Sequence, residues 1–125
     1  ARAAGLATLY GAPNILRGKS QSGSMRALDA VIKGVADCLC GDYSPAALLP
    51  AVMQLPNLAG IPLHEAIALV TRNPARAVGL HDRGVIAAGK RADLLAVRNL
   101  GKLPQAARVW SSGITVMALA FDHGE

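Results

Sequence analysis

The sequence predicts an α/β unit over residues 1–80, followed by antiparallel β structure from residue 84 onward. Two short apolar runs, residues 5–10 and 35–40, are separated by a crossover that contains an amphipathic helix. This is the pattern of two parallel strands in a βαβ unit. Signals for the start of a helix then recur as far as residue 80. Beyond that point short apolar runs alternate with turn residues, as they do in hairpins.

The first strand, residues 5–10, runs into a turn predicted from the Gly, Ala, Pro and Asn at residues 11–14. After a polar loop, a helix is predicted over residues 24–34, because apolar residues recur there at spacings of three and four. Ser24 is its candidate N-cap and Gly34 marks its end.

Three more helices follow the second strand. Ser44 and Pro45 form a cap with proline at the first helical position, and residues 46–55 continue that helix. Another helix is predicted over residues 62–71, again opened by proline. A short one is predicted over residues 73–79, where Asn-Pro begins the helix and glycine ends it.

The last part of the chain has the residue pattern of β-strands. Residues 84–86, 93–97 and 107–110 are short runs with β character. Ser-Gly at residues 112–113 separates the last of these from the apolar residues 114–117, which predicts a hairpin.

Composition excludes several classes of function. Hydrophobic residues make up 52% and charged residues 17%, which is not the composition of a disordered chain. Aromatic residues make up 3%, too few for base stacking, and the net charge of +5 is spread over both halves, so we expect no nucleic-acid partner. The longest stretch without a formal charge, residues 43–63, contains four prolines, so we expect no membrane span.

Cys38 and Cys40 share one face of the predicted second strand, where the geometry is poor for a disulfide between them. We therefore expect reduced thiols and a cytoplasmic protein. The two cysteines could also bind a soft metal ion, but such a site would need a further Cys or His pair. The sequence starts with Ala1 instead of Met and shows no apolar signal-peptide run. We therefore expect it to be a piece of a longer protein.

Four short motifs resemble the C-terminal signature of the amidohydrolase superfamily. They are Thr-Arg-Asn-Pro-Ala-Arg at residues 71–76, Gly-Leu at 79–80, Gly-Val-Ile at 84–86 and Gly-Lys-Arg-Ala-Asp-Leu at 89–94. The resemblance implies a metal-dependent hydrolase with a (β/α)8 barrel and a composite β-sandwich. It would make residues 1–80 the last two barrel strands with their helices, and residues 81–125 the C-terminal strands of the sandwich.

Residues 11–23 and the Asp-Tyr-Ser-Pro at 42–45 resemble one subgroup, the ribose 1-methylphosphonate 5-triphosphate diphosphatases of phosphonate (C–P lyase) metabolism. The resemblance extends over nearly the whole chain, although the subgroup commonly has His in place of Gln21 and Asn in place of Ser24. It implies a small phosphorylated substrate, hydrolysed to the 5-phosphate and diphosphate. It also implies a divalent metal, zinc or a similar ion, in the full-length parent.

Asp42 is the candidate catalytic and metal-binding residue. Strand alternation puts it on one face with Cys38 and Cys40, at the carboxyl end of the second strand, which the resemblance makes the last strand of the barrel. The resemblance implies that Asp42 binds the metal and takes a proton from the attacking water. The alternative is that Asp42 is an acid near the N-terminus of the following helix.

The loop after the first strand is the candidate phosphate site. Its candidate substrate-binding residues combine amide, guanidinium, hydroxyl and backbone N–H donors, which suit phosphate oxygens: Asn14, Arg17, Gly18, Ser20 and Ser22. Gly-Lys-Ser at residues 18–20 does not belong to a P-loop, because the spacing to the required earlier glycine is wrong. The alternative is an ordinary polar loop.

The rest of a metal site is not evident. His64, His81 and His123 form no His-x-His pair, and we interpret all three as solvated or capping residues. We therefore expect this chain alone to be inactive and to bind no metal. Two further hypotheses stay open: an amidohydrolase that acts on a C–N bond, as in a cyclic amidase or a deaminase, and a non-catalytic oligomeric module. Either a second copy or an N-terminal part of the same protein would cover the open strand edges.

Overall fold

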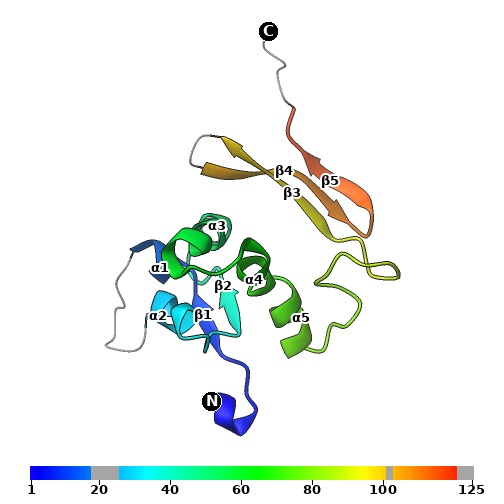
Figure 1. Cartoon of the computed structure of the whole chain (residues 1–125). Helices are drawn as coiled ribbons and strands as arrows, with labels where there is room; N and C mark the ends of the chain where they lie inside the picture. The colour runs from blue at the N-terminus through cyan, green and yellow to red at the C-terminus, as the bar shows by residue number, and fades with distance from the viewer. Residues whose placement is uncertain (18–25, 101–102, 121–125) are drawn as a thin grey trace.

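The computed structural model describes residues 1–17, 26–100 and 103–120. A small parallel sheet lies among five α-helices, and a three-stranded antiparallel sheet lies beyond them, next to α3 (Figure 1). In chain order the elements are η1 (Arg2–Ala4), β1 (Leu9–Gly11), α1 (Pro13–Arg17), α2 (Ala27–Ile32), β2 (Cys38–Cys40), η2 (Pro45–Ala47), α3 (Leu48–Ala59), α4 (Leu63–Ala68), α5 (Arg72–Ala77), β3 (Leu94–Leu100), β4 (Leu103–Ser111) and β5 (Ile114–Ala118).

The predicted βαβ unit is present. β1 and β2 are parallel, with Leu9 opposite Cys38 and Gly11 opposite Cys40, and α2 lies in the crossover between them. Both strands are shorter than the apolar runs that predicted them. Thr8 and Asp37 directly precede the two strands, and the Thr8 backbone N–H donates a hydrogen bond of 2.8 Å to the Asp37 carboxylate. The two segments are therefore also joined just before the backbone ladder begins.

The turn predicted over residues 11–14 is wrong, because a helix begins there. Ala12 still donates its N–H to the Cys40 carbonyl at 2.8 Å, and α1 starts at the next residue. Pro13 suits a first helical position because it has no N–H to leave unpaired. Burial of Pro13 and Ile15 holds this short helix against the rest of the fold.

The helix predicted over residues 46–55 extends to Ala59, after one 3₁₀ turn over Pro45–Ala47. It passes through Pro56, which removes one helical hydrogen bond. Leu55 is fully buried and Ala59 packs against the core, so tertiary packing favours continuing the helix past the proline. Gly60 then ends it in the left-handed region, at φ +68.

The helices predicted over residues 62–71 and 73–79 are observed over shorter ranges as α4 and α5. The predicted start at Asn73 is wrong, because α5 begins at Arg72 and has Thr71 at its N-cap position. The strand predicted over residues 84–86 is wrong. Gly84 adopts φ +93 and lies so close to α5 that a Cβ there would come within 3.0 Å of the Arg72 Cα atom. This contact turns the chain away from extended pairing, and Ile86 is left 89% exposed.

The hairpin at residues 112–113 is confirmed. Ser112 and Gly113 both have positive φ, 51° and 81°, which is the backbone of a two-residue type I′ turn. β4 pairs antiparallel with β5 on one side and with β3 on the other, with one irregularity in each ladder. The strands are longer than the sequence predicts, because the two ladders support each other.

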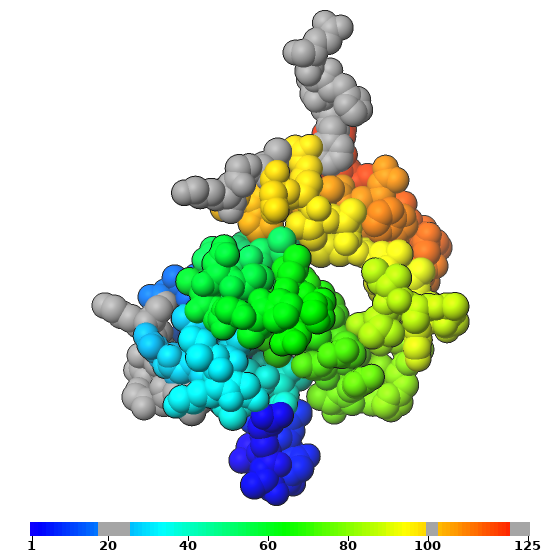
Figure 2. Space-filling model, in the orientation of Figure 1, coloured from blue at the N-terminus to red at the C-terminus, as the bar shows by residue number. Residues whose placement is uncertain are grey.

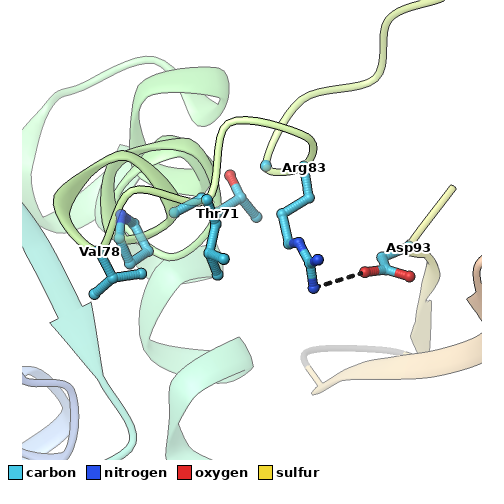
Figure 3. A pocket seen from close by; sticks show the side chains of 8 residues that line it. Thr71, Val78, Arg83 and Asp93 are labelled. Carbon is cyan, nitrogen blue, oxygen red and sulfur yellow. Dashed lines mark ion pairs between the residues drawn. The ribbon is translucent and has the colours of Figure 1, made fainter. Parts of the chain in front are cut away.

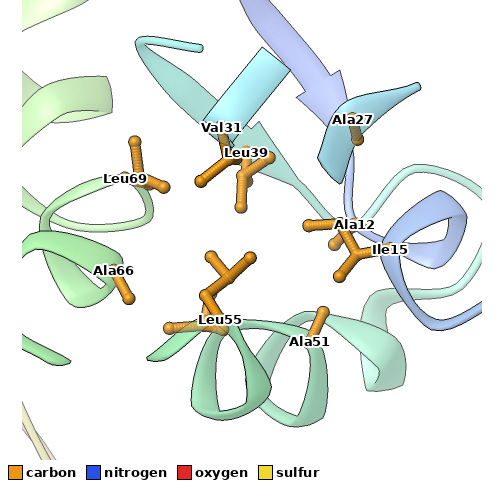
Figure 4. Close-up of a cluster of buried hydrophobic side chains, with 10 residues drawn as sticks. Ala12, Ile15, Ala27, Val31, Leu39, Ala51, Leu55, Ala66 and Leu69 are labelled. Atoms are coloured by element: carbon orange, nitrogen blue, oxygen red, sulfur yellow. The ribbon is translucent and has the colours of Figure 1, made fainter. Parts of the chain in front are cut away.

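The core lies between the parallel sheet and the helices. Leu39 of β2 is buried in one cluster with side chains from α1, α2, α3 and the end of α4 (Figure 4). The buried members of this cluster are Ala12, Ile15, Ala27, Val31, Leu39, Ala51, Val52, Leu55, Ala66 and Leu69. Four of these ten residues are alanines, so the helices approach the short sheet closely and fix the strand ends that carry the candidate site.

No helix in the described ranges has both the length and the apolar character needed to cross a bilayer.

Candidate functional site

The candidate site lies where β1 and β2 both end. Asp42 follows β2 in a tight turn and has φ +51, a left-handed conformation that is uncommon for a residue other than glycine. The turn closes with the Ser44 N–H donating to the Gly41 carbonyl at 3.0 Å. A residue held in this conformation is a candidate for a functional role, because the surrounding structure must stabilise it.

The Asp42 carboxylate lies against Gly11, the last residue of β1. A Cβ atom at Gly11 would lie 2.8 Å from Asp42 Oδ2 and 3.3 Å from Asp42 Cβ. The alternation of side chains that predicted a shared face with Cys38 and Cys40 ends with the strand at Cys40. The turn conformation therefore places Asp42, and glycine at position 11 leaves room for its carboxylate.

Arg17 contacts Tyr43, the residue that follows Asp42 in the sequence. The guanidinium carbon of Arg17, at the end of α1, lies 5.2 Å from the centre of the Tyr43 ring, within the range of a cation–π interaction. Asn14 is half-buried one helical turn earlier on α1. Gly18, Ser20 and Ser22 lie outside the described residues. The prediction of Ser24 as an N-cap is wrong, because α2 begins at Ala27 and has Arg26 at its N-cap position.

Arg17 has no anionic partner among the residues that the structure describes, and no hydrogen bond to the Asp42 carboxylate is formed within them either. The site thus combines a carboxylate acceptor and a cation whose polar atoms are available. This arrangement can bind a phosphate group through the cation and receive a proton at the carboxylate.

The other potential metal ligands do not converge on Asp42. Within the described ranges there is no group of three or more His, Cys, Asp and Glu side chains that could hold a metal ion. His64 and His81 are exposed, and His123 lies outside the described residues. Burial, and then the nearby charge of Asp37, raise the pKa of the Cys38 thiol, which disfavours its thiolate form.

Away from Asp42, a hollow lies between α5 and the loop that leads to β3 (Figures 2 and 3). It has a volume of about 380 Å³, and its lining residues are mostly apolar: Thr71, Pro74, Ala75, Val78, Leu80, Arg83, Gly84 and Asp93. Arg83 points across it to Asp93, with 3.9 Å between Nη1 and Oδ2, and also pairs with Asp82 at 2.8 Å.

Both charged side chains of that hollow have structural partners. Asp93 accepts hydrogen bonds from the Ser112 backbone N–H at 2.9 Å and from Arg91 Nε at 2.8 Å. These bonds, led by that of Ser112, hold the pKa of the Asp93 carboxyl below its ordinary value. Asp93 of the Gly-Lys-Arg-Ala-Asp motif therefore connects the hairpin turn to the loop before β3. The charged side chains that line the hollow serve this connection, so they do not indicate a ligand site.

The sequence analysis did not identify Gly11 or Tyr43 as parts of the site. Tyr43 is directly next to Asp42, and it is one of two tyrosines in the chain, so an aromatic residue beside a candidate carboxylate was the available signal. Nothing in the sequence pattern predicted the contact of Gly11 with Asp42.

The comparisons with known proteins agree with the predicted resemblance. A model of the amidohydrolase family matches residues 10–117. The chain is 42% identical over 111 residues to the alpha-D-ribose 1-methylphosphonate 5-triphosphate diphosphatase of Escherichia coli strain K12, which covers 87% of this chain and 29% of that protein. It is 34% identical over 88 residues to a dihydroorotase of Methanopyrus kandleri, covering 57% of this chain and 21% of that protein.

A solved structure gives the same result for the fold. The crystal structure of an amidohydrolase from Thermotoga maritima MSB8 matches with a TM-score of 0.55 and 26% identity, over 74% of this chain and 26% of that one. This chain thus spans less than a third of each of these proteins.

Proposed function

The chain belongs to the amidohydrolase family, and from this premise we propose that the protein carrying it is a metal-dependent hydrolase of phosphonate metabolism. Its substrate in this proposal is ribose 1-methylphosphonate 5-triphosphate, which it hydrolyses to the 5-phosphate and diphosphate. The observation that carries the proposal is the 42% identity to the diphosphatase of Escherichia coli, over a match that includes most of the chain. The Arg17 guanidinium, which pairs with no carboxylate among the described residues, supports a phosphate substrate.

The roles follow from the chemistry of the side chains. Water attacks phosphorus, the phosphoanhydride bond breaks and diphosphate leaves, while the Asp42 carboxylate accepts the proton that the water loses. Arg17 and Asn14 bind phosphate oxygens from α1. Gly18, Ser20 and Ser22 complete this group in the proposal, as the loop that follows Arg17.

Asp42 is also the proposed metal ligand of this chain. A carboxylate oxygen is a suitable donor for zinc, but catalytic zinc sites have three protein ligands. The described residues offer no such set around Asp42, so they do not by themselves fit a catalytic metal. The other ligands would have to come from outside these residues, and the proton step above needs only Asp42 itself.

An amidohydrolase that acts on a C–N bond is the alternative, and the match to the dihydroorotase supports it. The two functions make different demands on Arg17. A triphosphate presents several anionic oxygens to this cation, whereas dihydroorotate presents one carboxylate, so loss of Arg17 should weaken binding of the triphosphate more.

The test is an assay of the full-length protein with a divalent metal, on ribose 1-methylphosphonate 5-triphosphate and on dihydroorotate. We expect diphosphate release from the first substrate. Asp42→Asn should lower its kcat by about 10²–10⁴-fold, the usual contribution of a proton acceptor. Arg17→Ala should raise KM. Hydrolysis of dihydroorotate alone, or unchanged kinetics in Arg17→Ala, would contradict the proposal.

A further inference from the structure

Tyr43 has an unusual environment for an aromatic side chain. It is 57% exposed, so burial of its ring contributes little to stability. It directly follows Asp42, whose left-handed backbone conformation (φ +51) fixes the course of the chain at this turn. Its recorded contact is with Arg17, whose guanidinium carbon lies 5.2 Å from the ring centre.

A cation–π contact is an electrostatic attraction to the face of the aromatic ring and occupies none of the arginine N–H donors with a hydrogen-bond acceptor atom. The contact with Tyr43 therefore leaves these donors available. Within the described part of the chain no carboxylate competes for Arg17. The arrangement differs from those of Arg26, Arg83 and Arg91, each of which pairs with an aspartate at 2.8 Å.

We infer that Tyr43 is a positioning residue for phosphate binding: its ring holds the Arg17 guanidinium at the end of the parallel sheet and leaves its N–H donors for a phosphate oxygen. The inference rests on the proposed function, because it takes the ligand to be a polyphosphate. Tyr43 itself touches no reacting atom in this role. The contact restricts the Arg17 side chain before the anion arrives, so less side-chain conformational entropy is lost when the anion binds.

The inference predicts a dependence of Tyr43 on Arg17. An exposed cation–π contact corresponds to about a two- to fivefold change in an equilibrium constant. Tyr43→Leu, which keeps an apolar side chain without a π face, should weaken binding by this factor. Tyr43→Phe keeps the ring and should bind like the natural protein, because the contact does not involve the hydroxyl group.

The test measures binding of inorganic triphosphate to the full-length protein by titration calorimetry. The proteins compared are the natural one, Tyr43→Leu, Tyr43→Phe, Arg17→Ala and the double variant Arg17→Ala with Tyr43→Leu. We expect the loss caused by Tyr43→Leu to disappear when Arg17 is already alanine. Thermal melting of each variant checks that the fold is intact, which the exposure of Tyr43 favours.

The arms separate the two possible failures. If Arg17→Ala weakens triphosphate binding but Tyr43→Leu does not, the positioning role is wrong and the phosphate site stands. An equal loss from Tyr43→Leu with and without Arg17 would also overturn it, as would a loss from Tyr43→Phe as large as that from Tyr43→Leu. If Arg17→Ala leaves binding unchanged, the proposed phosphate site fails, and the inference fails with it.

Discussion

Gly11→Ala should disable the candidate site while leaving the fold intact. The new Cβ atom would lie 2.8 Å from Asp42 Oδ2, and ordinary contact begins near 3.4 Å, so the carboxylate oxygen must retreat by about 0.6 Å. A misplacement of about 1 Å at a reacting group can cost about a hundredfold in rate. We therefore expect kcat to fall about ten- to a hundredfold.

Stability should change little in this variant. Gly11 is not among the residues with positive φ, so alanine can adopt its backbone conformation. Replacing such a glycine stabilises a protein by about 0.4–1 kcal/mol through the unfolded state, which offsets the displacement of a mobile carboxylate. The melting temperature should thus stay within a few degrees of the natural protein while activity falls.

Gly84→Ala is the matched control, because it makes the same chemical change away from Asp42. There the Cβ atom would meet the Arg72 Cα and the Ala75 Cβ at 3.0 Å, at a backbone φ of +93. We expect a clear loss of stability and an unchanged kcat per folded molecule. The assay is diphosphate release by the full-length protein, with melting curves in parallel. A Gly11→Ala variant with the natural kcat would refute the reasoning, provided that Asp42→Asn is inactive.

Three further predictions concern stability. Leu55→Ala should cost about 2–5 kcal/mol of unfolding free energy, because Leu55 is fully buried at the centre of the cluster, and denaturant titration measures this loss. Thr8→Val should cost about 1–3 kcal/mol by the same measurement, since the Thr8 hydroxyl bonds the Val35 carbonyl at 2.6 Å and accepts from the Asp37 N–H at 3.0 Å. The hydrogen bonds that Thr8 donates, first from its backbone N–H and then from its hydroxyl, hold the pKa of the Asp37 carboxyl below its ordinary value. The stabilisation from Asp37 should therefore be complete above the unfolded pKa of about 3.9 and should be lost as the pH falls through the lower folded value. Melting curves against pH should show a smaller loss in Asp37→Asn, and equal curves would contradict the assignment.

Three features could be predicted because each has a local signal in the sequence. They are the pair of parallel strands, the final hairpin, and the four helices that lie between the first strand and residue 80. The apolar runs of β1 and β2, the proline that opens η2 before α3, the proline at the N-cap of α4 and the Ser112–Gly113 turn are of this kind. The passage of α3 through Pro56 could not be predicted, since it depends on what Leu55 and Ala59 contact in the folded chain.

The candidate site could be predicted less completely for the same reason. Strand alternation and the family resemblance indicate Asp42, and the donor groups of the loop indicate Arg17, but the contacts that define their geometry join distant parts of the chain. Tyr43 meets Arg17 across the end of the sheet, and Gly11 meets Asp42 from the neighbouring strand. No periodicity or spacing records such contacts, so they became visible only in three dimensions.

The two ends of the parallel sheet also differ in how their charged groups are satisfied. Where the strands begin, Asp37 accepts hydrogen bonds from the Thr8 N–H and hydroxyl and pairs with Arg2 at 3.2 Å. Where they end, Asp42 and Arg17 have no charged or hydrogen-bonding partner among the described residues. A carboxylate and a guanidinium that remain available contribute little to folding, but a ligand needs these groups. Substitutions at Thr8 should therefore change stability without changing catalysis, and those at Asp42 and Arg17 should do the reverse.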